Sequence, residues 1–208
     1  MTEGRIILGE VPFFPLPGVT LFPGALLPLH IFEPRYRKMT EDVLASNRLL
    51  CVVQLKQSEA VDEPQPEPFE IAGLGEVVDS ERLPDGRFNL LLRGRARVRI
   101  EELPFRGPYR RARALSLTET PGTADLDLRT LLFSAARTGL IKLQKRYPGA
   151  ELQLDPELEL HVLVDRCAQY LVHDTRTQQR LLETLDVTLR AQLCVDELLR
   201  QGVAGAAN

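Results

Sequence analysis

His161 and Asp165 are the side chains whose spacing first suggests chemistry. They lie four positions apart in the stretch HVLVD, so on a helix they share one face and could bind one metal ion. A zinc site needs further ligands, and HVLVD matches no known zinc spacing. Cys167 is six positions from His161 and falls off its face, which disfavours a Cys–His nucleophile. We therefore expect a polar pair on a helix surface, with no metal site and no catalytic residue.

Arginines recur at every second position near the middle of the chain. They are Arg93, Arg95, Arg97 and Arg99. On a strand, a period of two places the four arginines on one face and the apolar side chains on the other. Such a face could bind the phosphates of RNA. It could also be a solvent face that Glu101, Glu102 and the acidic segment 59–67 neutralise. No aromatic residue is interleaved among the arginines, which disfavours RNA because RNA-binding proteins usually stack bases on aromatic rings.

Residues 11–37 form the stretch around which the rest of the chain is organised. No charged residue occurs over 11–32, yet five prolines in that interval would break a membrane-spanning helix. We therefore predict short buried strands at 19–22 and 25–31, with the prolines at edges and turns. A helix over 34–46 should follow, because a proline in its first turn loses no hydrogen bond.

Strand-like patterns continue to about residue 117 and helical patterns follow. Pro84 and Gly86 predict a tight turn between two arms of a hairpin, because proline presets φ and glycine allows a positive φ. The predicted strands are 49–55, 76–83, 87–100 and 108–117, with a polar loop at 56–68. The predicted helices are 125–147, 155–172, 177–184 and 186–201, the second of them starting at Asp155-Pro156. The order predicts an α+β protein with a β-rich domain over 1–120 and a helical domain of about four helices over 121–208.

Composition places few restrictions on the partners of the chain. The 208 residues carry a formal net charge of −3, which gives no overall bias toward nucleic acid or an anionic membrane. Cys51, Cys167 and Cys194 form no CxxC pair and cannot all be joined in disulfides, so we expect buried thiols in a reducing cytoplasm. The first ten residues lack the pattern of a secretory signal.

Three stretches resemble one known family. They are PFFPLPGVTLFPGALLPLHIFEPRYRKM at 12–39, LPDGRFNLLLRGRARVRI at 83–100 and LLETLDVTLRAQLCVDELL at 181–199. Together they resemble the Lon-type N-terminal, substrate-binding domain over about residues 10–200, and most closely its stand-alone bacterial form. The resemblance implies a PUA-like pseudobarrel of about six strands followed by a helical bundle.

The motifs of the catalytic modules of a complete Lon-type protease are missing. The sequence has neither the phosphate-binding GxxxxGK[ST] loop nor GxSxG, and it contains no Gly-Lys pair. The chain also ends where the resemblance places the end of the first domain. We therefore predict a protein that is not an enzyme and binds no cofactor or metal. A hydrolase with an unrecognised site is the alternative that an activity screen would remove.

The resemblance implies a module that binds polypeptide. Its predicted contact residues lie at the start of the first helix: Glu33, Arg35, Tyr36 and Lys38. The alternative interpretation is structural, with Tyr36 packed in the core and Glu33 and Arg35 in local ion pairs. The predicted partners are unfolded or exposed polypeptide segments, together with a protease or chaperone for which the chain would be an adaptor. An RNA-binding protein that uses the four arginines is the alternative function, and a membrane partner is not expected.

Overall fold

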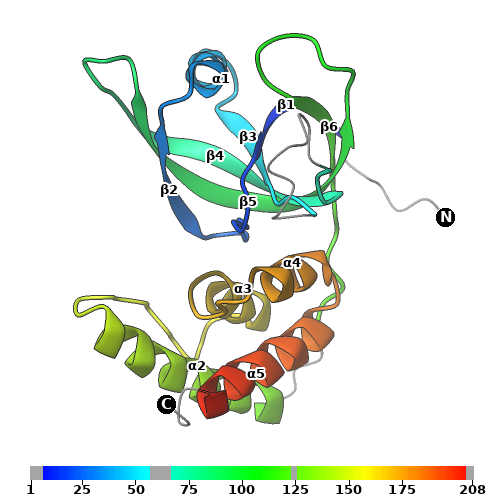
Figure 1. Cartoon of the computed structure of the whole chain (residues 1–208). Helices are drawn as coiled ribbons and strands as arrows, with labels where there is room; N and C mark the ends of the chain where they lie inside the picture. The colour runs from blue at the N-terminus through cyan, green and yellow to red at the C-terminus, as the bar shows by residue number, and fades with distance from the viewer. Residues whose placement is uncertain (1–6, 57–66, 123–125, 205–208) are drawn as a thin grey trace, which may run out of the picture. The chain divides into compact units, whose positions relative to one another are not determined.

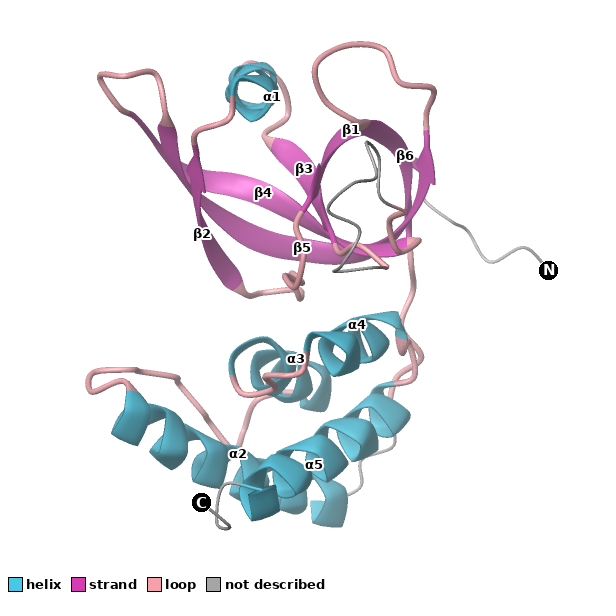
Figure 2. Cartoon of the chain, viewed as in Figure 1, coloured by secondary structure: helices cyan, strands magenta, loops and turns pink. Residues whose placement is uncertain are grey.

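A computed structural model describes residues 7–56, 67–122 and 126–204 of the chain (Figure 1). By internal contacts the chain divides into two compact units, Met1–Thr118 and Glu119–Asn208, and each is considered by itself. Within the described ranges, the first unit holds six strands and one helix, and the second holds four helices (Figure 2). The predicted α+β class is confirmed. Most of the loop predicted at 56–68 lies outside the described residues.

The first unit is a barrel with one added strand. Its elements are β1 (Ile7–Pro15), β2 (Leu26–Ile31), α1 (Pro34–Leu44), β3 (Leu49–Val53), β4 (Ile71–Arg82), β5 (Phe88–Glu102) and β6 (Arg111–Ser116). The strand order is β2-β5-β4-β3-β1-β6, and β6 also pairs with β5, so five strands close on themselves. β2 pairs with the first half of β5, and β6 pairs with the second half. β1 and β3 run parallel, and the other pairs are antiparallel.

Side chains from the five closed strands form the core of the barrel. They are Val11, Phe13, Cys51, Val53, Ala72, Leu74, Val98, Ile100, Ala112 and Ala114. The predicted hairpin of β4 and β5 is present, and its turn is closed by a bond of 2.8 Å from the Leu83 N–H to the Arg87 carbonyl. Gly86 has a φ of 82°, as this turn requires.

The segment between β1 and β2 packs directly on the backbone of the sheet. Leu21 and Phe22 are fully buried. A methyl group added to Gly73 of β4 would lie 2.0 Å from the Leu21 carbonyl oxygen, and one added to Gly94 of β5 would lie 2.0 Å from the Phe22 carbonyl oxygen. The predicted strand at 19–22 is therefore wrong: these residues cross the glycines in irregular structure and do not pair as a strand.

The helical unit contains α2 (Leu126–Arg146), α3 (Leu160–Tyr170), α4 (Thr175–Glu183) and α5 (Val187–Ala204). The predicted helix start at Asp155-Pro156 is wrong. The Asp155 carboxylate accepts a bond of 2.9 Å from the Glu157 N–H and closes a turn. Arg129 of α2 donates to the carbonyls of Pro156 and Leu158, and a guanidinium placed there competes with the first turn of a helix. None of the helices in the described part of the chain is long and apolar enough to cross a membrane.

A buried guanidinium holds three parts of the helical unit together. Arg190 of α5 is completely buried. Its Nε lies 3.1 Å from the Asp165 carboxylate of α3, and its Nη2 lies 2.6 Å from the Glu119 carboxylate. Its Nη1 donates to the Thr184 carbonyl at 2.7 Å. Because a buried charge is costly unless it is paired, these contacts fix how α3 and α5 pack.

Gly73→Ala should destabilise the protein by about 3 kcal/mol, because the new methyl group would overlap a backbone carbonyl that cannot move alone. The free energy of unfolding from a urea titration measures this effect. Gly139→Ala in α2 is the matched control, since its methyl group would meet Leu171 at an ordinary 3.7 Å. The control should be neutral or slightly stabilising because alanine favours helices. Equal effects of the two substitutions would contradict this account of the sheet.

Asp165→Asn should lower the free energy of unfolding by about 3 kcal/mol, since it removes one of two carboxylates from a fully buried guanidinium. Urea unfolding followed by circular dichroism provides the measurement. Glu70→Gln is the control, because Glu70 pairs with Arg99 in solvent, and we expect a change below about 0.5 kcal/mol. A change that small for Asp165→Asn would show that the Arg190 cluster does not stabilise the unit.

Candidate functional site

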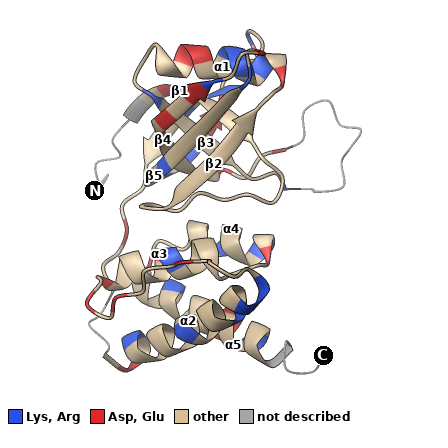
Figure 3. Cartoon of the chain, turned by 90° about the vertical axis from the view of Figure 1, so that its left-hand side faces the viewer, with Lys and Arg blue, Asp and Glu red and all other residues tan. Residues whose placement is uncertain are grey.

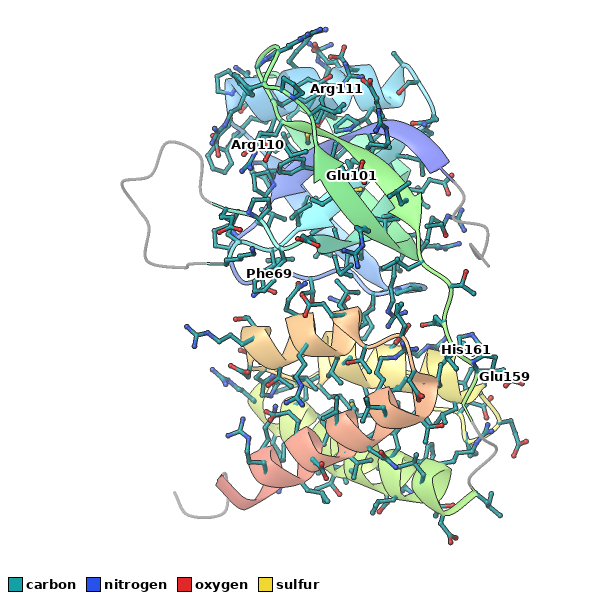
Figure 4. The ribbon with its side chains drawn as sticks, turned by 90° about the vertical axis from the view of Figure 1, so that its right-hand side faces the viewer. Phe69, Glu101, Arg110, Arg111, Glu159 and His161 are labelled. Atoms are coloured by element: carbon teal, nitrogen blue, oxygen red, sulfur yellow. The ribbon has the colours of Figure 1, made fainter. Side chains whose placement is uncertain are left out.

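The described residues contain no group of three or more His, Cys, Asp or Glu side chains that could hold a metal ion. The predicted surface pair of His161 and Asp165 does not form. Asp165 is 2% exposed and pairs with Arg190, whereas His161 is exposed at the start of α3 beside Glu159 (Figure 4). The spacing of four residues placed both side chains on one helix, as expected. The Asp165 carboxylate, however, pairs with Arg190 of α5 and is buried where the two helices pack.

The three cysteines are buried free thiols, as predicted. Burial raises the pKa of Cys51 to about 12. The pKa of Cys194 is also raised, first by a hydrogen bond with Cys167 and then by burial. Since a nucleophilic cysteine must reach the thiolate form, neither Cys51 nor Cys194 is poised for covalent chemistry near neutral pH.

The expectation that four arginines share one solvent face is wrong at Arg97. This side chain is 2% exposed and lies 5.5 Å from the centre of the Phe22 ring. Its cross-strand neighbour is Gly73, so the segment that covers the glycine also covers the arginine. A register shift near Gly94 leaves Arg95 without a cross-strand partner. A β-bulge of this kind reverses which face later side chains occupy, and the period of two cannot reveal it.

Most of the remaining positive charge in this region is neutralised. Arg95 pairs with Glu76, and Arg99 lies 2.9 Å from Glu70. On β6 and the loop before it, Arg113 and Arg110 pair with two glutamates of β5 in the same way. Arg93 is exposed and makes no ion pair with any residue that the structure describes. The continuous basic surface expected for a phosphate-binding strand is therefore reduced to single charges.

The residues predicted to contact polypeptide at the start of α1 behave differently from one another. Tyr36 is 7% exposed and packs its ring edge-on against Phe14, at 4.5 Å between centroids. Arg35 covers the outer side of the Tyr36 ring at 4.6 Å and pairs with Glu33 at 2.9 Å. Lys38 pairs with an aspartate one turn further along. Tyr36 is therefore a core side chain, and the charged residues surround it at the surface.

Asp42 ties α1 to the loop between β5 and β6. Its carboxylate accepts bonds from Lys38 at 2.7 Å and from the Tyr109 hydroxyl at 2.8 Å. The Lys38 bond is the main reason why the pKa of Asp42 is lowered. Burial, followed by the hydrogen bond to Asp42, raises the pKa of Tyr109 to about 12. The neutral phenol and the ionised carboxylate together position the helix.

The outward face of β2 presents apolar and aromatic groups to solvent. Its alternate residues Leu26, Pro28 and His30 are exposed, and so is Phe32, which follows the strand. Leu26 is 39% exposed and Phe32 is 60% exposed. We call these four residues the β2 face. No charged residue occurs in β2, whereas α1 carries many (Figure 3).

Neighbouring strands extend and fix the β2 face. Pro28 lies opposite Leu91 of β5, and His30 lies opposite Asn89. His30 Nδ1 is 2.8 Å from the Asn89 amide oxygen, and its ring is stacked with that of Phe32 at 6.3 Å. In the described sheet β2 is the end strand, with β5 as its one neighbour. An exposed sheet edge with apolar side chains is a surface on which another extended chain can pair.

Sequence reasoning placed a strand here but assigned it to the core. The uncharged stretch predicted a short buried strand at 25–31, whereas alternate residues of β2 are exposed. The available signal was Pro28, since a proline inside a strand marks an edge. The alternation of burial along β2 follows from its place at the end of the sheet, which the run LLPLHIF does not encode.

The helical unit has a pocket of about 330 Å³ at the start of α2. Its lining residues are Leu126, Arg129, Thr130, Phe133, Pro156 and Glu157. The Arg129 Nε donates to the Pro156 carbonyl at 2.8 Å, so the guanidinium in this pocket holds the α2–α3 connection in place.

A barrel with an added edge strand, followed by a separate helical unit, defines a two-unit protein of the α+β class. A family model described as the ATP-dependent protease La (LON) substrate-binding domain matches residues 10–200. The chain belongs to this family.

Curated relatives and solved structures agree with this assignment. The Lon protease of Heliobacterium modesticaldum is 27% identical over 206 residues, covering 95% of this chain and 24% of the relative. Lon protease 2 of Sorangium cellulosum is 29% identical over 199 residues, covering 92% of this chain and 25% of the relative. The chain thus spans about a quarter of the length of these relatives.

Two solved structures have the same fold. The N-terminal domain of the Mycobacterium avium complex Lon protease has a TM-score of 0.68 at 18% identity, covering 91% of this chain and 97% of that one. A Lon N-terminal domain protein from Xanthomonas campestris has a TM-score of 0.65 at 22% identity, covering 95% and 98%. The predicted pseudobarrel with a helical bundle is confirmed.

The pH dependence of stability should reveal the Tyr109 anchor. Because the pKa of Tyr109 in the folded state lies above its ordinary value of 10.0, the neutral phenol stabilises the fold below that pH. The contribution is lost as the pH rises through about 12. An ultraviolet titration of phenolate, comparing the protein with Tyr109→Phe, should show one tyrosine with a midpoint in that region. Asp42→Asn should lower this midpoint, and titration of Tyr109 at its ordinary pKa would contradict the assignment.

Proposed function

We propose that the chain is a non-catalytic module that binds exposed apolar segments of polypeptide along the β2 face. The observation that carries the proposal is the exposure of Leu26 on an end strand and of Phe32 directly after it, in a member of a substrate-binding family. An extended segment laid along β2 would add a strand to the sheet. Its main chain would supply affinity that is independent of sequence, and the exposed side chains would select for apolar residues.

Phe32 is the main source of binding energy in this proposal. Its ring is 60% exposed in the folded protein, and removing an aromatic ring from water is worth about 2 kcal/mol. The ring is held by stacking with His30, which in turn contacts Asn89. A pre-positioned aromatic ring loses little rotamer entropy when a partner binds, and such residues dominate recognition surfaces.

Charged residues at the start of α1 form the polar border of the proposed site. Glu33 directly follows Phe32, and its ion pair with Arg35 keeps both side chains in place. Lys38 lies one turn further on and completes this border. Tyr36 contributes from below, because its buried ring supports the Arg35 guanidinium. In this proposal Glu33, Arg35 and Lys38 contact the polypeptide, whereas Tyr36 positions them.

The module is proposed to act as an adaptor in the cytoplasm. It would hold an unfolded chain and present it to a protease or chaperone that supplies the chemistry. The sequence carries no GxxxxGK[ST] loop, and the family match covers a substrate-binding domain. Buried free thiols support a reducing compartment.

RNA binding is less well supported by the same geometry. A phosphate-binding strand needs several unpaired cations in a row. Arg97 is buried and Arg95 and Arg99 are neutralised by glutamates, so the charge that would attract a backbone of phosphates is largely absent.

Phe32→Ala should weaken binding to an unfolded polypeptide about ten-fold, because it removes the most exposed ring of the β2 face. Fluorescence anisotropy with labelled, reduced and carboxymethylated lactalbumin gives the dissociation constant. Phe105→Ala is the matched control: Phe105 is 53% exposed on the same unit but lies on the loop after β5, and its loss should leave affinity unchanged. Equal losses for the two variants would refute the proposed surface. Cleavage of the probe by the purified protein would refute the non-catalytic assignment.

A further inference from the structure

The charged residues that border the β2 face are mostly paired with one another. Arg87, near His30, lies 2.6 Å from Asp85. Arg35 pairs with Glu33, on the helix that follows Phe32. A guanidinium that already has a carboxylate partner adds little to the attraction of a charged ligand. The charge selectivity of the face therefore depends on the few groups that remain unpaired.

Arg93 is one such group, and it lies at the end of β2 where the strand begins. It is the cross-strand partner of Leu26 on β5, so the two residues share one face of the sheet. On its other side, Arg93 lies opposite Glu76 of β4. The Glu76 carboxylate is bound by Arg95. The Glu76 carboxylate is thus already neutralised by Arg95, so the unpaired Arg93 gives this end of the face a net positive charge.

The other end of the face carries the opposite charge. Asn89 lies opposite His30, and its amide nitrogen donates to the Glu81 carboxylate at 2.9 Å. Glu81 is exposed and forms no ion pair within the ranges that the structure covers. A neutral, apolar strip thus runs between a positive end at Arg93 and a negative end at Glu81. A bound chain would meet different charges at its two ends.

We propose that Arg93 makes the module selective for apolar segments that are flanked by an acidic residue. This inference rests on the proposed function of the β2 face. An apolar stretch laid over Leu26 and Phe32 would bring its flanking residue next to the Arg93 guanidinium. The carboxylate of an Asp or Glu would be attracted there, whereas a Lys would be repelled, and burial of the apolar stretch would reduce screening by water. The acidic flank would also fix which end of the segment lies at the start of β2.

The test uses short fluorescein-labelled peptides with an alternating apolar core. Each carries Asp or Gln at one flank, in both chain orders, and anisotropy is measured on the full chain at low salt. We expect the better Asp peptide to bind about three-fold more tightly than its Gln counterpart. The preference should disappear in Arg93→Gln, while the affinity for the Gln peptide stays the same. It should also shrink at high salt, since exposed charges are screened.

Arg99→Gln is the matched control, because this arginine lies on the same strand but is paired with Glu70. It should retain the preference for Asp. An equal affinity of the unmodified chain for Asp and Gln peptides, or a preference that survives Arg93→Gln, would overturn the role of Arg93 and leave the β2 face intact. Absence of binding by every peptide would instead overturn the proposed function, and the selectivity with it.

Discussion

The close approach of the segment at residues 16–25 to the sheet is the constraint on which the β unit depends. Two carbonyl groups, from Leu21 and Phe22, lie against glycines that have no room for a side chain. That contact buries both apolar side chains and covers Arg97. It also delivers the chain to the start of β2, where the Gly24 N–H donates to the Gly94 carbonyl at 2.9 Å and the Gly94 N–H donates to the Ala25 carbonyl at 2.9 Å. The position of the β2 face is therefore a consequence of glycines on other strands.

The different surroundings of the arginines on β5 follow from the same packing of residues 16–25 on the sheet. A bulge at Arg95 lets β5 turn from the closed barrel toward β2, and it changes the face on which later arginines lie. Arg97, after the bulge, lies under the segment at residues 16–25, whereas Arg93, before the bulge, lies beside β2. Ion pairs between neighbouring strands neutralise most of the rest. The result is a strand whose arginines differ in exposure and pairing, although they recur regularly in the sequence.

The sequence predicted the elements well and the environments of individual side chains poorly. The β4–β5 hairpin was predictable because Pro84 and Gly86 determine the turn locally. The order of strands before helices was predictable because the hydrophobic period changes near residue 120. Burial of Arg97 was not, because it depends on a segment more than seventy residues away in the chain. The exposure of β2 was missed for a similar reason, since the neighbours of a strand are set by the topology of the sheet.

The place of β1 in the sheet bears on how the protein is made. β1 lies between β3 and β6, so its second neighbour is the final strand of the unit. During synthesis the ribosome must deliver residue 116 before that pairing can form. Until then the uncharged stretch over residues 11–32 has no completed sheet to pack against, and such nascent chains are prone to aggregate. The nascent chain thus passes through a stage in which it exposes the kind of apolar segment that the proposed β2 site would bind.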